Sequence, residues 1–445
     1  MENLKKMSIQ YSDLVVALDI GTTKICAVAG RLDQYDKLEV VGIGKVESQG
    51  VTRGVVSNIE KTVKAISEAV SICENMIGKR ITHVHVGIAG QHIKSLVHRG
   101  MLTRDHNNTE ISRLDIEKLV NDMHKLVLPA GDKILHVIPQ EYTVDNEQGI
   151  TDPIGMSGVR LEANFHIITG QITASSNIHK CVEKAGLKVA DMTLEPIASS
   201  HAVLSEEEKE AGVVLVDIGG GTTDLAIFHE GIIRHTAVIP FGGNVITKDI
   251  KDGCSVMQHQ AEKLKVKFGS SFADEVYDNR VITIPGLNNR DVKEISEKNL
   301  ARVIQARMEE ILDYVIWEVK KAGYERKIVA GIVLTGGGSL LQNIEKLCEF
   351  HTGVITRIGV PVEILAHGYS EQINSPILST AVGLLLKAAR NNQYVVMNDL
   401  KTEEEIVENE VEEVEHIQDE KPKSFFTSII KKTKEWFEAE PDSEF

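Results

Sequence analysis

Residues 217–224 have the sequence DIGGGTTD, and residues 19–24 carry a related stretch, DIGTTK. An apolar run precedes each stretch (VVLV and LVVAL, respectively), and another apolar run follows it (LAIF and ICAVA). β-Forming residues on both sides predict that each glycine-rich stretch is the bend of a hairpin. The repeat of such a segment, with similar flanks, predicts a chain built from two similar halves.

The familiar nucleotide-binding motifs do not explain these bends. A P-loop needs the pattern GxxxxGK[ST], which the sequence lacks. A Rossmann loop needs a third glycine after Gly219 and Gly221, and Asp224 stands in its place. The candidates that begin at Gly42 and Gly336 lack the third glycine as well. In both motifs the glycine-rich turn opens a helix, whereas here a β-like run follows.

Both bends carry groups that suit a phosphate. Glycines let backbone N–H groups approach a ligand without obstruction by a Cβ atom, and threonines add hydroxyl donors. Asp19 and Asp217, at the ends of apolar runs, could hold Mg²⁺ through its water ligands. The candidate phosphate donors are Gly21, Thr22, Thr23, Lys24, Gly219, Gly220, Gly221, Thr222 and Thr223. A pair of tight β-turns without a ligand is the alternative, and the occurrence of two matched loops favours phosphate.

A third glycine-rich segment, GIVLTGGGSLL at residues 331–341, also follows an apolar run. Gly336, Gly337 and Gly338 would leave a flat backbone surface on which a base or a sugar can lie. An ordinary helix N-terminus with Ser339 nearby is the alternative, and the segment taken alone favours it.

The body of the chain, up to about Arg390, alternates β-like and helical patterns, which predicts an α/β fold. Apolar residues at spacings of three and four predict helices at residues 57–77 and 299–322, and residues 376–389 form a third, small and apolar one. Residues 91–164 are polar and mixed and contain three prolines, so we interpret them as an inserted subdomain.

Composition and charge exclude several classes of protein. Of the 445 residues, 42% are hydrophobic, so the chain can build its own cores. Five well-separated cysteines without a CxxC pair argue against a zinc ribbon and fit a reducing compartment. No apolar run is long enough to span a membrane, and the N-terminus lacks a signal core. The net charge of -16 is concentrated in the tail and no basic face stands out, so nucleic acid is not an expected partner.

These segments resemble a known superfamily, the actin-like ATPases. The two hairpins, LEPIASS at residues 194–200 and TGGGS at residues 335–339 carry that resemblance, and GMSGVRLEANFHIITG at residues 155–170 is similar to the FtsA family of bacterial cell division proteins within it. The resemblance implies an α/β, actin-like (ribonuclease H-like, duplicated) fold of two halves with an inserted family-specific subdomain. It also implies a disordered acidic linker and a C-terminal amphipathic helix.

The resemblance further implies how the chain divides. The expected parts are a first core subdomain at residues 12–87 and 166–210, the inserted subdomain at residues 88–165, a second core subdomain at residues 211–245 and 325–392, a smaller subdomain at residues 246–324, the acidic linker at residues 393–420 and the membrane-targeting helix at residues 421–438.

ATP and Mg²⁺ are the ligands that the resemblance implies, with residues 19–24 and 217–224 as the two phosphate loops. The further implied roles are Glu195 near the γ-phosphate and its water, Glu262 and Lys265 at the ribose, and Gly336, Gly337 and Ser339 at the adenosine. Without the resemblance, Glu195 and Glu262 would be interpreted as ordinary carboxylates on the surface of a helix. Hydrolysis is implied to be slow at most.

The resemblance implies protein partners as well. The smaller subdomain would receive the C-terminal tail of the tubulin-like protein FtsZ, with Arg307 as the contact that we expect, although an exposed arginine on a helix is usually only solvated. The chain would associate with itself into filaments, and the inserted subdomain would bind other division proteins. These roles place the protein on the cytoplasmic side of the cell membrane, at the division site.

The tail has a pattern of its own. Residues 403–420 contain ten acidic residues and no lysine or arginine, which predicts an extended, flexible linker. On a helical wheel the following residues form an apolar strip edged by lysines, which is typical of a helix that lies in the interface of an anionic membrane. The expected contacts are Phe425, Phe426, Ile429, Ile430, Lys431, Lys432, Trp436 and Phe437. Docking in the groove of a partner, or on the body of the chain, is the alternative.

Three other functions compete with a membrane-tethering filament protein. An MreB-like filament protein is the nearest, but residues 155–170 and the C-terminal position of the amphipathic strip argue against it. A sugar-kinase-type phosphotransferase needs a catalytic aspartate in a substrate pocket, and the sequence identifies none. A chaperone ATPase needs a substrate domain after about residue 390, where too few residues remain.

Overall fold

The computed structural model of the chain describes residues 14–104, 110–277, 280–284, 292–362, 364–366 and 373–392. By its contacts the chain divides into two units, residues 1–390 and residues 391–445, and the first unit holds the sheets. The predicted acidic linker at residues 393–420 and the predicted membrane-targeting helix at residues 421–438, with all of its expected contacts, lie outside the described residues.

Two five-stranded sheets with the same topology form the core of the first unit. In each sheet an antiparallel meander of three strands is extended on one side by two parallel strands. The first sheet has the order β11 (Lys188–Leu194), β6 (His83–Ile88), β1 (Val15–Ile20), β2 (Lys24–Leu32) and β3 (Leu38–Glu47). The second has the order β18 (Thr356–Ile358), β17 (Gly331–Thr335), β12 (Val213–Ile218), β13 (Thr223–His229) and β14 (Ile232–Ile239). The two orders correspond strand by strand, which confirms the predicted pair of similar halves.

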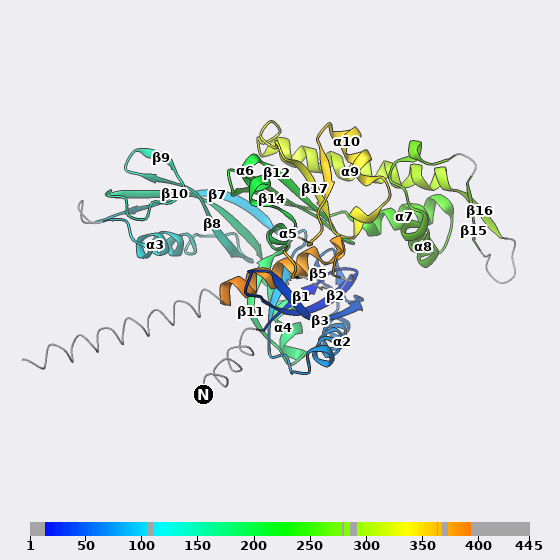
Figure 1. Ribbon diagram of the computed structural model, residues 1–445, viewed down its shortest axis with the longest axis horizontal. Coiled ribbons are helices and arrows are strands. Elements are labelled where there is room, and N and C mark those ends of the chain that lie inside the picture. The colour runs from blue at the N-terminus through cyan, green and yellow to red at the C-terminus, as the bar shows by residue number, and fades with distance from the viewer. Residues whose placement is uncertain are drawn as a thin grey trace, which may run out of the picture. The chain divides into compact units, whose positions relative to one another are not determined.

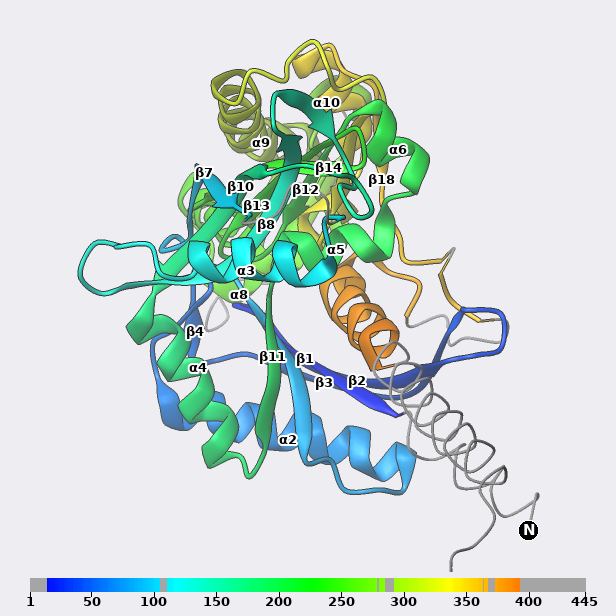
Figure 2. The ribbon, with the colours of Figure 1, turned by 90° about the vertical axis from the view of Figure 1, so that its left-hand side faces the viewer.

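Helices bury the apolar faces of both sheets. The first sheet packs on α2 (Ile59–Ile77) and α4 (Ile172–Lys184). The second packs on α7 (Gly243–Cys254), α8 (Gln258–Phe268), α9 (Glu297–Lys321) and α10 (Ile344–Thr352). Two helical segments lie between the inner faces of the two sheets: α5 (Glu195–Val203) and residues 379–390. Figure 2 shows the second of these in orange. The two halves therefore share one layer of helices.

The termini of α2 show why the sequence folds in this way locally. The side chain of Asn58 accepts a hydrogen bond from the backbone N–H of Lys61, which satisfies one of the free donors of the first turn. The helix ends at Gly78, whose left-handed backbone (φ 67°) suits glycine. Between these caps, apolar residues at helical spacing bury one face, as the sequence predicted.

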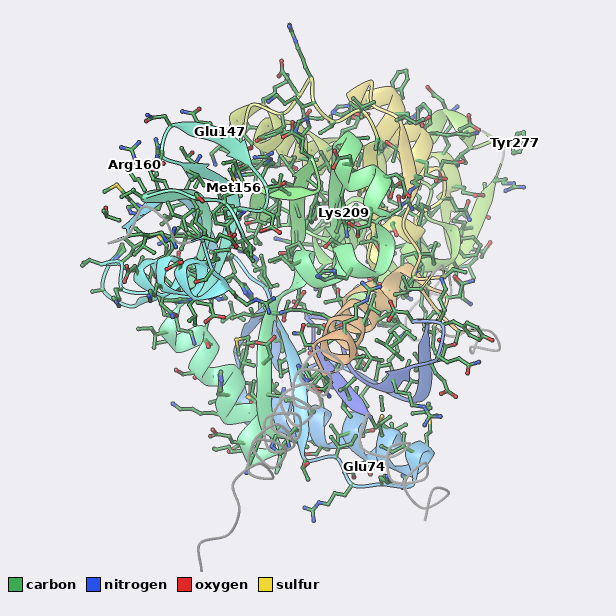
Figure 3. All side chains as sticks on the ribbon, turned by 60° about the vertical axis from the view of Figure 1, so that its left-hand side comes forward. Glu74, Glu147, Met156, Arg160, Lys209 and Tyr277 are labelled. Carbon is green, nitrogen blue, oxygen red and sulfur yellow. The ribbon has the colours of Figure 1, made fainter. Side chains whose placement is uncertain are left out.

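The insertion forms a separate antiparallel sheet with its own core. Its order is β7 (Lys94–Thr103), β10 (Arg160–Gln171), β8 (Asp132–Val144) and β9 (Glu147–Ile150), and α3 (Arg113–Met123) covers it. Figure 1 shows this sheet on one side of the second core sheet, with α7 and α8 on the other. In Figure 3, Glu147 and Arg160 mark the inserted sheet, and Tyr277 lies on the far side of the second core sheet from them.

Short elements complete the described fold. They are β4 (Val51–Thr52), β5 (Val55–Val56), α6 (Glu206–Ala211), the 3-10 helix η1 (Ala273–Glu275), β15 (Val281–Ile284), β16 (Lys293–Ser296), and the 3-10 helices η2 (Gly337–Leu340) and η3 (Pro376–Leu378).

Candidate functional site

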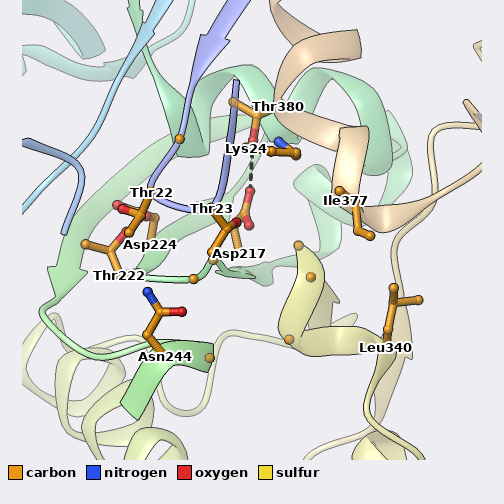
Figure 4. Close-up of a pocket in the computed structure, with 18 of the residues that line it drawn as sticks. Thr22, Thr23, Lys24, Asp217, Thr222, Asp224, Asn244, Leu340, Ile377 and Thr380 are labelled. Atoms are coloured by element: carbon orange, nitrogen blue, oxygen red, sulfur yellow. Dashed lines mark hydrogen bonds between the residues drawn. The ribbon is translucent and has the colours of Figure 1, made fainter. Parts of the chain in front are cut away.

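A cavity of about 410 Å³ lies between the two halves, and both glycine-rich hairpin bends line it (Figure 4). The structure brings most of the predicted site residues to this one place. The predicted residues in its lining are Asp19, Gly21, Thr22, Thr23, Lys24, Glu195, Asp217, Gly219, Gly220, Gly221, Thr222, Glu262, Lys265, Gly336, Gly337 and Gly338. Residues predicted from five distant segments thus surround a single space of a size typical for ligand sites.

The two bends have the same local structure. In the first, the backbone N–H of Gly21 donates to the carbonyl oxygen of Lys24 at 3.0 Å, and in the second the N–H of Gly219 donates to that of Thr222 at 2.9 Å. The bends also touch each other, because a Cβ atom added to Gly220 would lie only 2.2 Å from Cγ2 of Thr23. The repeated sequence therefore produces two matched turns that contact each other and line the same cavity.

Backbone donors at the bends remain available for a ligand. Within the described part of the chain, the N–H groups of Thr22, Thr23, Gly220 and Gly221 donate to no protein acceptor. N–H groups that converge from turns attract anions, and phosphate groups above all. The donor set therefore suits a polyphosphate that lies between the bends.

Asp19 and Asp217 are both buried at the ends of β1 and β12. The ammonium group of Lys24 forms an ion pair with Asp19. Asp217 Oδ2 accepts hydrogen bonds from the hydroxyl of Ser199 at 2.7 Å and from that of Thr380 at 3.2 Å, the contact drawn in Figure 4. These contacts fix both carboxylates at the floor of the cavity.

The cavity holds more acidic than basic groups at its floor. Burial, reinforced by the charges of Asp19, Asp224 and Asp217, raises the pKa of Glu195 well above its usual value. Burial and the charge of Asp217 raise the pKa of Asp224 to about 7. Asp224 Oδ2 accepts from the hydroxyl of Thr222 at 2.9 Å, whereas its Oδ1 is buried without a hydrogen-bond partner among the described residues. A bound cation would relieve this concentration of carboxylates.

Residues of α7 and α8 form the opposite wall. Lys265 Nζ donates to the carbonyl oxygen of Gly243 at 2.9 Å and to the hydroxyl of Thr247 at 2.8 Å, and it pairs with Glu262 at 2.8 Å. The hydroxyl of Thr247 also donates to Glu262. The predicted pair is therefore tied to the first turn of α7, where Asn244 points into the same space (Figure 4).

Three predicted residues lie elsewhere. Thr223 is buried and its hydroxyl donates to the carbonyl oxygen of Phe241 at 2.9 Å, outside the cavity lining. Ser339 is fully buried and its hydroxyl donates to the carbonyl oxygen of Gly336 at 2.8 Å. Arg307 lies on α9, where its guanidinium pairs with Asp249.

Sequence reasoning missed several residues of the lining, notably Asp224, Asn244 and Thr380. Asp224 follows Thr222 by two positions, and residues of a strand that are two apart share a face, so strand alternation could have found it. A Gly-Gly pair at residues 242–243, where α7 begins, could have indicated Asn244. Thr380 has no local signal, because only the tertiary fold brings its helix to Asp217.

We expect the Asp224→Asn variant to lose a pH dependence of stability that the wild type has. The raised pKa means that the folded protein holds a proton that the unfolded chain releases between about pH 4 and pH 7, so the free energy of unfolding falls as pH rises through that window. Asparagine removes this penalty. The ligand-free variant should be more stable than the wild type by about 2 kcal/mol at pH 8, and the difference should vanish near pH 4, as measured by urea unfolding in a metal chelator.

Asp145→Asn is the matched control, with the opposite sign. Hydrogen bonds from the backbone N–H groups of Arg160 and Val159 lower the pKa of Asp145, so its charged form stabilises the fold. This variant should lose stability at pH 8 rather than gain it. An equal effect of Asp224→Asn at pH 8 and pH 5 would contradict the burial of a titrating carboxyl group in the cavity.

The residues present fit a nucleotide with Mg²⁺. Buried carboxylate oxygens, including the unpartnered Oδ1 of Asp224, are the hard ligands that Mg²⁺ prefers, and free N–H groups suit the phosphates. No group of three or more metal-ligating side chains occurs within the described ranges. Two aspartates, water and phosphate oxygens would therefore have to complete the shell of the metal.

Known proteins are similar to this chain over most of its length. The chain is 44% identical over 382 residues to the cell division protein FtsA of Pseudomonas aeruginosa. The aligned residues cover 85% of this chain and 90% of the relative. The relative from Escherichia coli K12, with the same description, is 36% identical and covers 84% of this chain and 89% of its own length. The chain belongs to the FtsA family of cell division proteins.

Family models agree with the FtsA assignment. The model described as cell division protein FtsA matches residues 214–383, and the one described as the SHS2 domain inserted in FtsA matches residues 90–169. The predicted resemblance is therefore confirmed, and the inserted sheet falls in the part that the second model matches.

Solved structures share the actin-like fold of this FtsA-family chain. A PilM-PilN type IV pilus biogenesis complex aligns with a TM-score of 0.62 at 15% identity, over 84% of this chain and 98% of that one. MreB5 of Spiroplasma citri bound to ADP aligns with a TM-score of 0.50 at 17% identity, over 86% and 99%. The predicted actin-like α/β fold is confirmed. None of the helices in the described part of the chain is long and apolar enough to cross a membrane.

Proposed function

We propose that this cell division protein binds ATP with Mg²⁺ between its halves, assembles into filaments, and anchors the FtsZ ring to the cytoplasmic face of the cell membrane through its C-terminal helix. The observation that carries the proposal is the cavity lined by two matched hairpin bends in a chain of the FtsA family. The role of the nucleotide is to hold the two halves together.

The free N–H groups at the bends, with Lys24, support the assignment of the phosphates to the space between residues 19–24 and residues 217–224. Glu262 and Lys265 would bind the ribose, and Gly336 and Gly337 would lie along the adenosine. The fold neighbour MreB5 of Spiroplasma citri is bound to ADP in its own structure, which supports a nucleotide as the ligand.

Asp19 and Asp217 would hold Mg²⁺ through its waters, and the ion would neutralise charge on the phosphates. Glu195 faces the same space and would orient a water near the γ-phosphate. Burial, with the charges of Asp19, Asp224 and Asp217, raises its pKa.

The partner sites are proposed from the family. The tail of FtsZ would bind the smaller subdomain at residues 246–324, and Arg307 would change partners there, because Asp249 and Glu310 hold its guanidinium in the free protein. The inserted sheet would bind other division proteins. The acidic linker at residues 393–420 would give the membrane helix at residues 421–438 its reach.

Co-sedimentation with FtsZ on lipid vesicles, with and without ATP, tests the whole proposal. The full chain should recruit FtsZ to vesicles that contain anionic lipid, and ATP should increase the amount recruited. Failure to bring FtsZ to the vesicles under both conditions would reject the tethering function.

A chain that ends at Glu420 should fail to float with anionic vesicles. The deleted residues contain the apolar strip and five lysines, each worth about 1 kcal/mol at an anionic surface. Replacing Trp436 and Phe437 by alanine should reduce flotation of the full chain by more than about tenfold, since two buried aromatic side chains contribute several kcal/mol. Equal flotation of the truncated chain would remove the membrane role while leaving the nucleotide site untouched.

A further inference from the structure

One side chain of the inserted sheet contacts the backbone just before Glu195, a residue of the cavity lining. His136 lies in β8, and its Nε2 accepts a hydrogen bond from the backbone N–H of Leu194 at 3.0 Å. Leu194 is fully buried, ends β11, and immediately precedes Glu195, the first residue of α5. Since β11 is an edge strand of its sheet within the described residues, the ring supplies an acceptor that no neighbouring strand provides there.

The ring of His136 is suited to accept the hydrogen bond from Leu194. Burial, together with the charge of Lys387, lowers the pKa of His136 to about 4, so the ring is neutral at physiological pH and has a free acceptor nitrogen. The same end of β11 is fixed by Lys387, whose ammonium group donates to Asp191 Oδ2 at 3.1 Å and to Thr193 Oγ1 at 2.7 Å. His136 and Lys387 therefore both hold the end of β11 that leads into Glu195.

The other part of β8 contacts the second half. Gln140 Nε2 donates to the carbonyl oxygen of Ile233 at 2.9 Å, and Glu141 pairs with Arg234, both on the β14 strand. Figures 1 and 2 show β8 running from the region of β11 toward the second core sheet. A single strand of the insertion therefore contacts both halves, at the residue before Glu195 and at β14.

We infer that His136 is a positioning residue for Glu195 and that, through it, β8 transmits the presence of the γ-phosphate from the cavity to the inserted subdomain. The inference rests on the proposed binding of ATP. A γ-phosphate that engages Glu195 restrains the start of α5, and the hydrogen bond from Leu194 passes this restraint to the His136 ring and to the sheet around it. The surface of the inserted subdomain would then differ between the ATP and ADP states, although it lies outside the cavity lining.

Amide hydrogen exchange tests this inference on the full chain, with Mg²⁺ and either a non-hydrolysable ATP analogue or ADP. In the wild type, both ligands should slow exchange at residues 19–24 and 217–224, and the analogue alone should slow exchange at residues 132–144 by about fivefold or more, the effect of one restrained hydrogen-bond network. In His136→Leu, the analogue should still protect both bends but no longer residues 132–144. His136→Gln, whose amide oxygen can accept the same hydrogen bond, should restore most of the effect.

His98→Leu is the matched control, because His98 is an exposed histidine on β7 of the same sheet and should behave as the wild type. The inference is overturned if the wild type shows protected bends without any difference between the analogue and ADP at residues 132–144, or if His136→Leu retains that difference. The wild-type comparison decides the matter even if His136→Leu fails to fold. Absence of protection at the bends themselves would instead reject the binding of ATP, and with it the basis of the inference.

Discussion

The Gly220→Val variant should lose most of its affinity for Mg²⁺-ATP while it remains folded. A Cβ atom at position 220 would lie 2.2 Å from Cγ2 of Thr23, and valine adds two further carbons to this contact. Since Gly220 and Thr23 belong to opposite halves, the added side chain would push the two bends apart at the place where the phosphates should lie. Overpacking of this kind costs about 2 to 3 kcal/mol, which corresponds to a loss of roughly 30- to 150-fold in affinity by equilibrium titration.

Two further variants sharpen this test. Gly253 lies outside the cavity lining, and a Cβ atom there would meet Cγ2 of Val303 at 3.4 Å, an ordinary van der Waals contact, so Gly253→Ala should bind ATP with nearly normal affinity. Replacing Thr23 by serine removes the methyl group in the way, so the double variant Gly220→Ala, Thr23→Ser should bind better than Gly220→Ala alone. Undiminished affinity of Gly220→Val would show that the ligand does not lie between the bends.

The Gly383→Ala variant should be strongly destabilised. A Cβ atom on Gly383 would lie 1.8 Å from the carbonyl oxygen of Ala198, a backbone atom of α5 that no side-chain rotation can move away. The helix at residues 379–390 would have to separate from α5, in the layer that both halves share. We expect a loss of about 3 kcal/mol or more in the free energy of unfolding, despite the gain of about 1 kcal/mol in helix propensity, as measured by urea denaturation.

Gly253→Ala provides the matched control in another helix. Gly253 lies in α7, and a Cβ atom there would meet Cγ2 of Val303 at 3.4 Å, an ordinary van der Waals contact. This substitution should stabilise the protein by about 0.5 to 1 kcal/mol, because alanine restricts the unfolded chain. If both variants have the same small effect on stability, the helix at residues 379–390 does not pack against α5 as closely as described.

The duplicated fold could be predicted because its signal is local and repeated. A strand-end aspartate, a glycine-rich bend and a following β-run prescribe a hairpin, and their second occurrence prescribes the second sheet. The bends at Asp19 and Asp217 therefore line the same cavity, as expected. The insertion was visible as a change in composition, although its strand order was not, because non-local pairing leaves no mark in a single sequence.

The misplaced and missed site residues have physical causes. Thr222 and Thr223 are neighbours in sequence, but the side chain of Thr223 points away from the cavity. Because side chains alternate along a strand, Asp224 lines the cavity instead. Ser339 satisfies the backbone of its own turn. Thr380 lies far from either bend in sequence, so that only the completed fold brings it to Asp217.

Ion pairs and hydrogen bonds between distant segments could not be predicted from the sequence either. Arg307 looked like an exposed arginine, yet Asp249 of α7 holds it, and the spacing of these residues in sequence gives no hint of the pair. The same holds for His136 and Leu194, whose hydrogen bond joins the insertion to the end of β11 just before Glu195. Contacts of this kind depend on how whole elements pack, and a sequence pattern describes only one element at a time.

A crystal structure of the full chain with Mg²⁺ and a non-hydrolysable ATP analogue would show directly whether a nucleotide binds between the two bends. We predict that the triphosphate lies between residues 19–24 and residues 217–224, within reach of the N–H groups of Thr22 and Gly220, with the metal beside Asp19 and Asp217. A triphosphate bound anywhere else, or an empty cavity at a saturating concentration of the analogue, would contradict the account.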